Sequence, residues 1–335
     1  MSSLSDFKVN ACQEADLIRV IDFFKKMQNS TLYFLPEEKN DIVKKYRKYK
    51  DGSEGLSLFL LKDKNKNIIG CSGYVPFKGI LCGQAIDGFI GSDAIIDANE
   101  RKQFPLLAML LAHCYENLVR KEKLFPLVCP ANKEVSKSFE SVQWQDFCRI
   151  WRLTSDFAVK MIPKLVFSGI EFKQIKHFDK DFKSFFEKIK EEHHFLLNTD
   201  ISFLNWKYFS DSSAKNVVLA AFKKKKISGY IIAEKRYGDI HIIDITVDLK
   251  YPSTILYLLF KSLDYFEIKE LTPIVCCLSH KSYIDILMRA GFIQNWRIDC
   301  LFFKVGLLFS KIKSGNFYSS NKDLYHFNGF AQHLY

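Results

Sequence analysis

The sequence has no long uninterrupted apolar run, and without one it predicts no membrane-spanning helix. A helix that crosses a bilayer needs about 18 consecutive apolar residues, whereas His113, Glu116 and Asn117 interrupt the longest apolar helical stretch. The N-terminal segment MSSLSDFKVN has no charged lead followed by an apolar run, so we expect no signal peptide.

Disulfide and metal-binding patterns are also missing. The nine cysteines are scattered and odd in number, and no CxxC pair occurs. Cys276 and Cys277 are adjacent, and neighbouring residues of a strand point to opposite faces, so this pair is not expected to share a metal ion. The pattern predicts buried free thiols in a reducing cytoplasm, with no metal site.

The chain does have an excess of positive charge. Its formal net charge is +11, which favours an anionic partner such as nucleic acid, a phosphorylated cofactor, a nucleotide-linked substrate or an acidic membrane face. The densest basic run, Lys223–Lys226, lies between two strand-like segments and is interpreted as a solvated hairpin turn. The 335 residues predict two domains.

One order of elements occurs twice along the chain. Each copy opens with an extended segment and an amphipathic helix, then a short aromatic-basic helix at 43–49 or 204–209. Paired strands, a further strand at 93–98 or 240–248 and a long apolar helix follow. Pro105 suits the first turn of that helix in the first copy, and Ser253 its N-cap in the second. A buried strand and a last helix close each copy.

This order predicts a mixed α/β (α+β) sheet, because strands follow strands with helices between them. The two copies are expected at 1–157 and 165–305. The segment 306–335 lies beyond both, and its aromatic content predicts a docked tail.

Two short motifs resemble those of GNAT N-acyltransferases. That family's cofactor motif is V-x-P-x-x-R/Q-x-x-G-x-G/A; here Ile96 to Arg101 follows its first half, and Lys102 to Leu106 occupies its phosphate loop. The second motif, N-x-x-A…L-Y-x-x-x-G-F, is best matched by ILMRAGFI, which ends in Gly291, Phe292 and Ile293. The resemblance implies two GNAT-like repeats in one chain.

A narrower resemblance is to tandem GNAT proteins found with surface-polysaccharide genes. It rests on the helix Trp206-Lys207-Tyr208 and on Ile243-Asp244 in the following strand. It implies an amino sugar, free or nucleotide-linked, as the acceptor.

The resemblance implies acetyl-CoA or another acyl-CoA as cofactor. By position, Ile95, Ile96 and Ala98 would line the pantetheine. The phosphates would lie at the following helix N-terminus, where backbone amides are unsatisfied. The remaining residues implied at the cofactor are Arg101, Lys102, Gln103, Phe104, Leu106 and Asn132.

This chain departs from the family pattern at several of these positions. Both motif glycines are missing, Phe104 and Leu106 hinder close backbone approach, and Pro105 lacks an amide donor. The tyrosine that often acts as an acid in the family falls on Phe139, and the second copy has no basic phosphate turn. At most one cofactor site is expected, in the first copy.

Direct attack of an amine on a thioester needs positioning and a base. The candidate bases are Asp93, placed at the start of the fourth strand, Asp87, placed in the preceding segment, and Asp244, within IIDITVD. Each is also a residue type common at turns and strand ends. Candidates for stacking on a sugar or a base are Trp206, Tyr208 and Tyr46, although aromatic helix faces are usually core. His193 and His194 are expected to be structural.

Three functions remain open. The first is acyl transfer from acyl-CoA to a primary amine of a small molecule. The second is a Fem-type transferase, which uses aminoacyl-tRNA and would fit the charge of +11. Dispersal of that charge, with no basic stripe interleaved with aromatics, speaks against it. The third is a non-catalytic binding protein whose cofactor turns have decayed.

Overall fold

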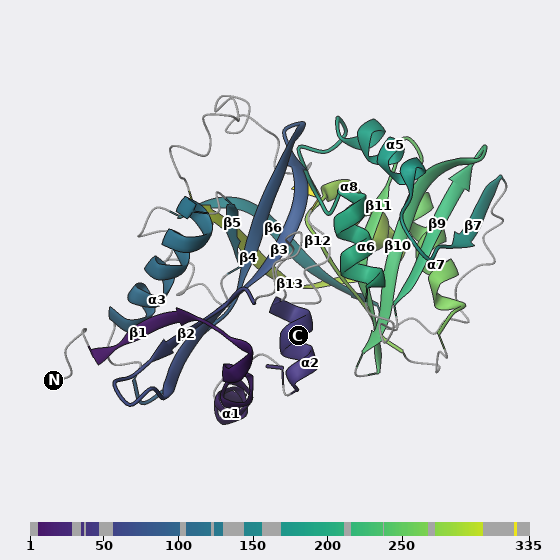
Figure 1. Ribbon diagram of the computed structural model, residues 1–335. Coiled ribbons are helices and arrows are strands. Elements are labelled where there is room, and N and C mark those ends of the chain that lie inside the picture. Colours follow the sequence, from purple (N-terminus) through teal and green to yellow (C-terminus); the bar gives the residue numbers. More distant parts are fainter. Residues whose placement is uncertain are drawn as a thin grey trace.

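Two halves with the same order of elements share one mixed sheet. The computed structural model describes residues 6–28, 35–36, 38–46, 56–100, 105–121, 124–129, 144–155, 169–210, 216–236, 238–266, 272–303 and 325–326. The strands follow the order β1-β2-β3-β4-β5-β13-β6-β12-β11-β10-β9-β7. Figure 1 shows the first half in purple and blue and the second in green. The predicted mixed α/β sheet is confirmed.

The first half runs from β1 to β6. Its elements are β1 (Lys8–Ala11), a 3₁₀ turn (Glu14–Asp16), α1 (Leu17–Gln28), α2 (Lys39–Tyr46), β2 (Leu58–Lys62), β3 (Ile68–Leu81), β4 (Gln84–Ile96), α3 (Pro105–Tyr115), a π-helical extension (Glu116–Lys121), β5 (Phe125–Val128) and β6 (Trp144–Ser155).

The second half runs from β7 to β13. Its elements are β7 (Ile170–Gln174), α5 (Lys180–Ile189), β8 (Phe195–Leu197), α6 (Ile201–Phe209), β9 (Val217–Lys223), β10 (Lys226–Arg236), β11 (Asp239–Val247), α7 (Thr254–Leu263), β12 (Ile274–Leu278), α8 (Lys281–Arg289) and β13 (Ile293–Phe303). In the tail, Tyr325 and His326 form β14, which pairs with β8.

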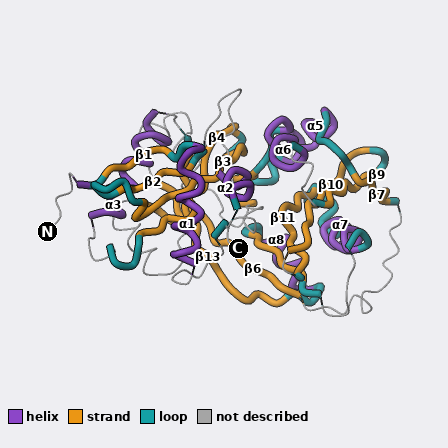
Figure 2. Tube along the Cα trace, turned by 60° about the horizontal axis from the view of Figure 1, so that its bottom comes forward, coloured by secondary structure: helices purple, strands orange, loops and turns teal. Residues whose placement is uncertain are grey.

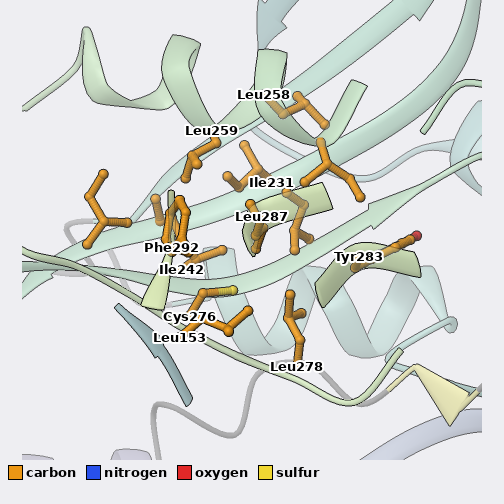
Figure 3. Close-up of a cluster of buried hydrophobic side chains, with 14 of the residues drawn as sticks. Leu153, Ile231, Ile242, Leu258, Leu259, Cys276, Leu278, Tyr283, Leu287 and Phe292 are labelled. Atoms are coloured by element: carbon orange, nitrogen blue, oxygen red, sulfur yellow. The ribbon is translucent and has the colours of Figure 1, made fainter. Parts of the chain in front are cut away.

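Helices cover both faces of the sheet in each half. In the first half, α1 and α2 pack on one face and α3 on the other. In the second half, α5 and α6 cover one face, and α7 and α8 cover the other. Figure 3 shows the second of these cores, where Leu258 and Leu259 of α7 meet Leu287 of α8 and Ile231 of β10.

Local sequence explains where these helices begin. The carboxylate of Asp179 accepts a hydrogen bond from the Asp181 amide at the start of α5. Asp200 does the same for the Phe203 amide at the start of α6. Such caps satisfy amides that have no partner inside the helix. On α5, the buried side chains recur at helical spacing (Phe182, Phe185, Phe186 and Ile189), so one face packs on the sheet.

The two halves exchange their last strands. After β5, the chain crosses into the second half, where β6 pairs with β12, Cys276 lying opposite Leu153. In return β13 pairs with β5, Leu301 lying opposite Val128. The two exchanged strands also pair with each other along their length. Each half-sheet therefore ends on a strand that belongs, in sequence, to the other half. Figure 2 shows β6 and β13 between the two halves.

Several expected elements differ in the structure. The strand expected at 93–98 is the long β4, Gln84–Ile96, which forms a hairpin with β3. The exchange of β6 and β13 is not predicted by the sequence, because the helical and strand periodicities describe local structure and not which strands pair. Ser253 stands at the N-cap of α7, but its backbone is helical and its hydroxyl makes no capping hydrogen bond.

One other expectation is confirmed. The basic run Lys223–Lys226 is a hairpin turn between β9 and β10, with positive φ at Lys224 (52°) and Lys225 (63°). Over the described residues, none of the helices combines the length and apolar character needed to cross a membrane.

Candidate functional site

In the first half, β4 extends beyond its described pairing with β5. The two strands pair in parallel from Gly88 opposite Phe125 to Gly91 opposite Val128, and the pairing then stops. Beyond Gly91, β4 continues to Ile96 while its only described strand partner is β3. An unpaired strand edge presents backbone N–H and C=O groups. This edge can therefore bind an extended polar ligand.

A β-bulge marks the point where β4 leaves β5. Cys71 of β3 pairs with Ile95, but Gly73 pairs with Ser92, so β4 has one extra residue here. Within the bulge, Asp93 has a φ of +51°. Side chains other than glycine rarely adopt this conformation, and such residues cluster at functional sites. Bulges also bend a strand and re-aim its side chains.

The Asp93 carboxylate is held by one of its oxygens. Oδ2 accepts hydrogen bonds from the hydroxyls of Tyr46 and Ser92 (2.9 Å for Ser92) and is 2.6 Å from the Nζ of Lys45. No described residue donates a hydrogen bond to Oδ1. Only 5% of the Asp93 side chain is exposed. The carboxylate is thus fixed in orientation through Oδ2, and Oδ1 has no donor among the described residues.

Tyr46 and Lys45 both belong to the last turn of α2. Burial, followed by the charge of Asp93, raises the pKa of Tyr46 well above its ordinary value, so its hydroxyl stays protonated and donates. Tyr46 is fully buried in the core between α1, α2 and the sheet. Its ring packs against Gly73, where any Cβ would overlap it. In this structure Tyr46 orients Asp93 and presents no face to solvent.

The predicted base candidates lie apart. Asp93 is near the end of β4 and not at its start, because β4 begins nine residues earlier, at Gln84. Asp87 belongs to the same strand and not to a preceding segment. Its side chain is 61% exposed and 3.5 Å from Lys78 across the hairpin. Asp244 lies in the second half, on β11.

The predicted cofactor residues fall into two groups. Ile95 and Ile96 are buried in the cores on opposite faces of β4, so only their backbone lies at this edge. Ala98 is exposed in the turn after β4, and the Leu106 side chain is buried against α3 and the sheet. The positions that lie outside the described residues are Arg101, Lys102, Gln103, Phe104 and Asn132.

The equivalent edge of the second half is closed. There β11 and β12 pair from Ile240 to Ile242, and the pairing then stops. The hydroxyl of Tyr283, on α8, accepts a hydrogen bond from the Val247 amide (2.8 Å) and donates one to the Val247 carbonyl (3.0 Å). A side chain of the protein itself thus occupies the edge of β11.

Two buried histidines pack beside Tyr283, and we call the three side chains the Tyr283 plug. The ring centroid of His193 lies 5.1 Å from that of His280 and 6.2 Å from that of Tyr283. Burial lowers the pKa of His193 to about 4 and that of His280 to about 3, so both are neutral at pH 7. Nδ1 of His193 lies 3.1 Å from the Ile189 carbonyl, to which it donates as a neutral ring. The expected structural role of His193 agrees with these contacts.

Asp244 is the centre of a polar cluster in the second half. It is 1% exposed. Its Oδ2 accepts hydrogen bonds from the Tyr230 hydroxyl (3.2 Å) and the Asn198 amide (3.5 Å), and its Oδ1 accepts one from Thr246 (3.4 Å). Lys207 and Tyr208, at the end of α6, lie within electrostatic reach of it. Both oxygens of Asp244 are therefore already bonded.

Corresponding contacts occur in the two halves. Lys26 in the last turn of α1 pairs with Asp97 just after β4, and Lys188 in the last turn of α5 pairs with Asp248 just after β11. The amide of each aspartate bonds to the neighbouring strand, Asp97 to Ile69 (2.8 Å) and Asp248 to Ser228 (3.0 Å). The recurrence shows that the halves match at individual residues.

Sequence reasoning assigns no role to Lys45, Lys207 or Asn198. A usable signal was present: both aromatic-basic helices contain a Lys-Tyr pair, and both following strands carry an aspartate four residues before a second one. Among the described residues, no group of His, Cys, Asp and Glu side chains could hold a metal ion.

No family model and no curated protein matches the sequence. Solved structures do. The GCN5-related N-acetyltransferase from Kribbella flavida is 11% identical, with a TM-score of 0.60 over 89% of this chain and 71% of that one. The GCN5-related N-acetyltransferase from Sphaerobacter thermophilus is 13% identical, with a TM-score of 0.58 over 90% and 96%.

A similar match is found to the Saccharomyces cerevisiae N-myristoyltransferase with bound myristoyl-CoA. It is 8% identical, with a TM-score of 0.61 over 90% of this chain and 84% of that one. At such identities the likeness concerns the fold. The chain therefore has the GNAT fold, in the form of two GNAT-like units that share a mixed α/β architecture.

Proposed function

We propose that the protein is an acyl-CoA-dependent N-acyltransferase that acylates a primary amine by direct attack. The single observation that carries the proposal is Asp93, a carboxylate fixed through Oδ2 and free at Oδ1, beside the open edge of β4. Both features belong to the first half, and the GNAT fold of the chain supports reading them as one acyl site.

The open edge fits the polar arm of an acyl-CoA. Backbone groups of Ile95, Ile96 and Ala98 would hold the pantetheine, and Arg101, Lys102 and Gln103 the phosphates, ahead of α3. Phe104, Leu106 and Asn132 complete the proposed set. When bound, acyl-CoA supplies an activated acyl group. The Tyr283 plug at the equivalent edge of β11 supports one such site per chain.

The role of Asp93 is to take the proton of the acceptor ammonium on Oδ1. Lys45 and Tyr46 keep it oriented, because they bind the other oxygen. No covalent intermediate on the protein is needed. Asp87 is too exposed for this role, and Asp244 has both oxygens bonded.

The proposed acceptor is a small-molecule amine, either an amino sugar or its nucleotide-linked form. Trp206 and Tyr208 on α6 are the proposed contacts to it. The net charge of +11 supports ligands that carry phosphates. Every cysteine whose side chain is described is a free thiol, which supports a location in the reducing cytoplasm.

Calorimetric titration of acetyl-CoA tests the proposal. We compare the wild type with the double variant Arg101→Ala/Lys102→Ala and with Lys224→Ala/Lys225→Ala, which loses the same charge at an exposed hairpin. Charge-assisted hydrogen bonds are worth about 1.5–3 kcal/mol each, so the first variant should bind at least tenfold more weakly and the second like the wild type.

Two results would contradict the proposal. One is a wild type that binds no acetyl-CoA. The other is equal weakening in both double variants, which would indicate general charge attraction. Salt-sensitive retention on immobilised tRNA without acetyl-CoA binding would favour the aminoacyl-tRNA alternative, and neither activity would favour a non-catalytic binding protein.

A further inference from the structure

A Lys-Tyr pair ends the second helix of each half, and both pairs face an aspartate on a bulged strand. In the first half the pair is Lys45-Tyr46 and the aspartate is Asp93. In the second half the pair is Lys207-Tyr208. The same number of residues separates Tyr46 from Lys26 as separates Tyr208 from Lys188, so the two pairs occupy equivalent places.

In the first half this arrangement is complete by itself. The Lys45 ammonium and the Tyr46 hydroxyl both bond to the carboxylate of Asp93. The side chains of Lys45 and Asp93 are 12% and 5% exposed, so water contributes little there. Each buried donor has its acceptor.

In the second half, the described residues offer the pair no hydrogen-bond acceptor. Tyr230, Asn198 and Thr246 occupy the oxygens of Asp244. Within the part of the chain that the structure describes, no acceptor lies within bonding distance of the Lys207 ammonium. Its Nζ lies 5.3 Å from the ring centroid of Tyr208 and 5.8 Å from that of Phe203. Burial lowers the pKa of Lys207 to about 8, and the charge of Asp244 opposes this only in part.

Two more polar atoms of the second half have no hydrogen-bond partner among the described residues. The hydroxyl oxygen of Tyr208 makes no hydrogen bond, although the residue is only 2% exposed. Oδ1 of Asn198 receives none either, and that residue is fully buried, with a φ of +56°. A buried polar group without a partner costs about 1–3 kcal/mol. The buried Tyr208 hydroxyl and Asn198 Oδ1 therefore have no described partner, and the partly buried Lys207 ammonium lies within electrostatic reach of the same Asp244.

These atoms lie where the two halves meet. Asn198 directly follows β8, which pairs with β3 of the first half, and the Thr199 amide bonds to the Lys78 carbonyl (3.3 Å). Figure 1 shows α6 between the β3–β4 hairpin and strands β10 and β11. The cluster thus faces the half that carries the proposed acyl site.

We infer that Lys207, Tyr208 and Asn198 bind an oxyanion carried by the acceptor amine, a carboxylate or a phosphate. The inference rests on the proposed function and adds the substrate class. The oxyanion would accept from Lys207 and Tyr208, because charge-assisted hydrogen bonds are the strong ones. Asn198 Oδ1 would accept an N–H or O–H of the same molecule.

The probes are two pairs of amines that differ in the oxyanion. The phosphate pair is glucosamine and glucosamine 6-phosphate, and the carboxylate pair is propylamine and β-alanine. Calorimetry of the full chain without acyl-CoA should show at least tenfold tighter binding of one oxyanion-bearing member, and the pair that responds identifies the source. Lys207→Met should abolish this preference. Lys225→Met, which removes an exposed charge from the β9–β10 turn, should keep it.

A stability measurement checks the same idea without any ligand. Tyr208→Phe removes a hydroxyl that has no partner, so its thermal midpoint should equal or exceed that of the wild type. Tyr46→Phe removes a hydroxyl that bonds to Asp93, so its midpoint should fall. Tyr208→Phe should also weaken binding of the preferred probe.

Three results would overturn the inference. They are a wild type that binds no oxyanion-bearing probe, an unchanged preference in Lys207→Met, and a clear fall in the midpoint of Tyr208→Phe. None of these measurements uses acyl-CoA. Failure here with intact acetyl-CoA binding therefore leaves the proposed function standing, and failure of acetyl-CoA binding alone leaves the oxyanion site standing.

Discussion

The hydroxyl of Tyr283 bonds both backbone polar groups of Val247, accepting from its nitrogen and donating to its oxygen. This side chain of α8 thereby satisfies the backbone amide and carbonyl of β11, as a neighbouring strand does elsewhere in the sheet. The first half leaves the matching stretch of β4 beyond Gly91 open toward β5. The equivalent strand edges of the two halves therefore differ: a side chain caps the edge of β11, whereas β4 beyond Gly91 has no described partner on its β5 side.

Removing this hydroxyl should destabilise the protein. In Tyr283→Phe, the amide and carbonyl of Val247 lose their partner in a fully buried place, which costs about 1–3 kcal/mol. Urea unfolding measures the change. Tyr265→Phe, at a side chain that is 48% exposed, should change stability by less than about 0.5 kcal/mol. Equal stability of the two variants would show that the Val247 contacts contribute nothing.

Replacing the proposed base should affect turnover and not cofactor affinity. Asp93→Asn keeps the shape of the side chain but cannot take a proton, so kcat should fall about 10²–10⁴-fold. The Kd for acetyl-CoA should stay within about twofold of the wild type. Asp87→Asn, at the exposed part of the hairpin, is the matched control and should keep wild-type kinetics. Wild-type turnover in Asp93→Asn would remove Asp93 as the base.

A methyl group at position 73 should displace Tyr46. The Cβ added by Gly73→Ala would overlap the Tyr46 ring, which is buried and ties α2 to Asp93. Overpacking of this kind costs about 1–3 kcal/mol, and the thermal midpoint should fall accordingly. The control is Gly91→Ala, whose Cβ would meet its nearest neighbour at 3.5 Å, an ordinary contact. A fall of the same size in the control would point to strand flexibility and not to Tyr46.

The buried histidines should make the protein less stable in mild acid. The pKa values of His193 and His280 are lowered from 6.5 to about 4 and about 3. Below pH 6.5 the unfolded chain therefore binds protons that the folded protein does not, and the free energy of unfolding falls as the pH drops toward 4. Each histidine contributes on the order of 3 kcal/mol over this window.

The variant His280→Asn isolates one of these contributions. Asparagine is a good N-cap, and position 280 is the N-cap of α8, so the fold should be kept. Urea unfolding from pH 7 to pH 4.5 should then show a shallower loss of stability than in the wild type. His177→Asn, at an exposed position, should leave the slope unchanged. An unchanged slope in His280→Asn would mean that His280 does not carry the effect.

Local patterns predicted most of the helices and strands. The apolar spacing of α1, α5 and α7 and the Lys224-Lys225 turn depend on neighbouring residues, so they can be read in sequence. The exchange of β6 and β13 depends on partners more than a hundred residues away. The spacing of apolar residues along the sequence does not indicate such long-range pairing.

The candidate site was predictable in composition but not in geometry. Asp93 was identified as a base candidate. Its place in a bulge, however, follows from the pairing of β4 with β3, where Ser72 lies opposite two residues of β4. Its partners come from α2, whose Lys-Tyr pair looked like an ordinary aromatic-basic helix. Asn198 could not be found, because its contact with Asp244 joins residues 46 positions apart.

The exchange of β6 and β13 makes the two halves mutually dependent in folding. A fragment that ends before the second half would carry β6 with no β12 to receive it, and its own β5 would end on a bare edge. Two separately produced fragments, cut between residues 157 and 165, should each remain incompletely folded and should recombine on mixing into a stoichiometric pair. We therefore expect the two sequence repeats to fold as a single cooperative unit.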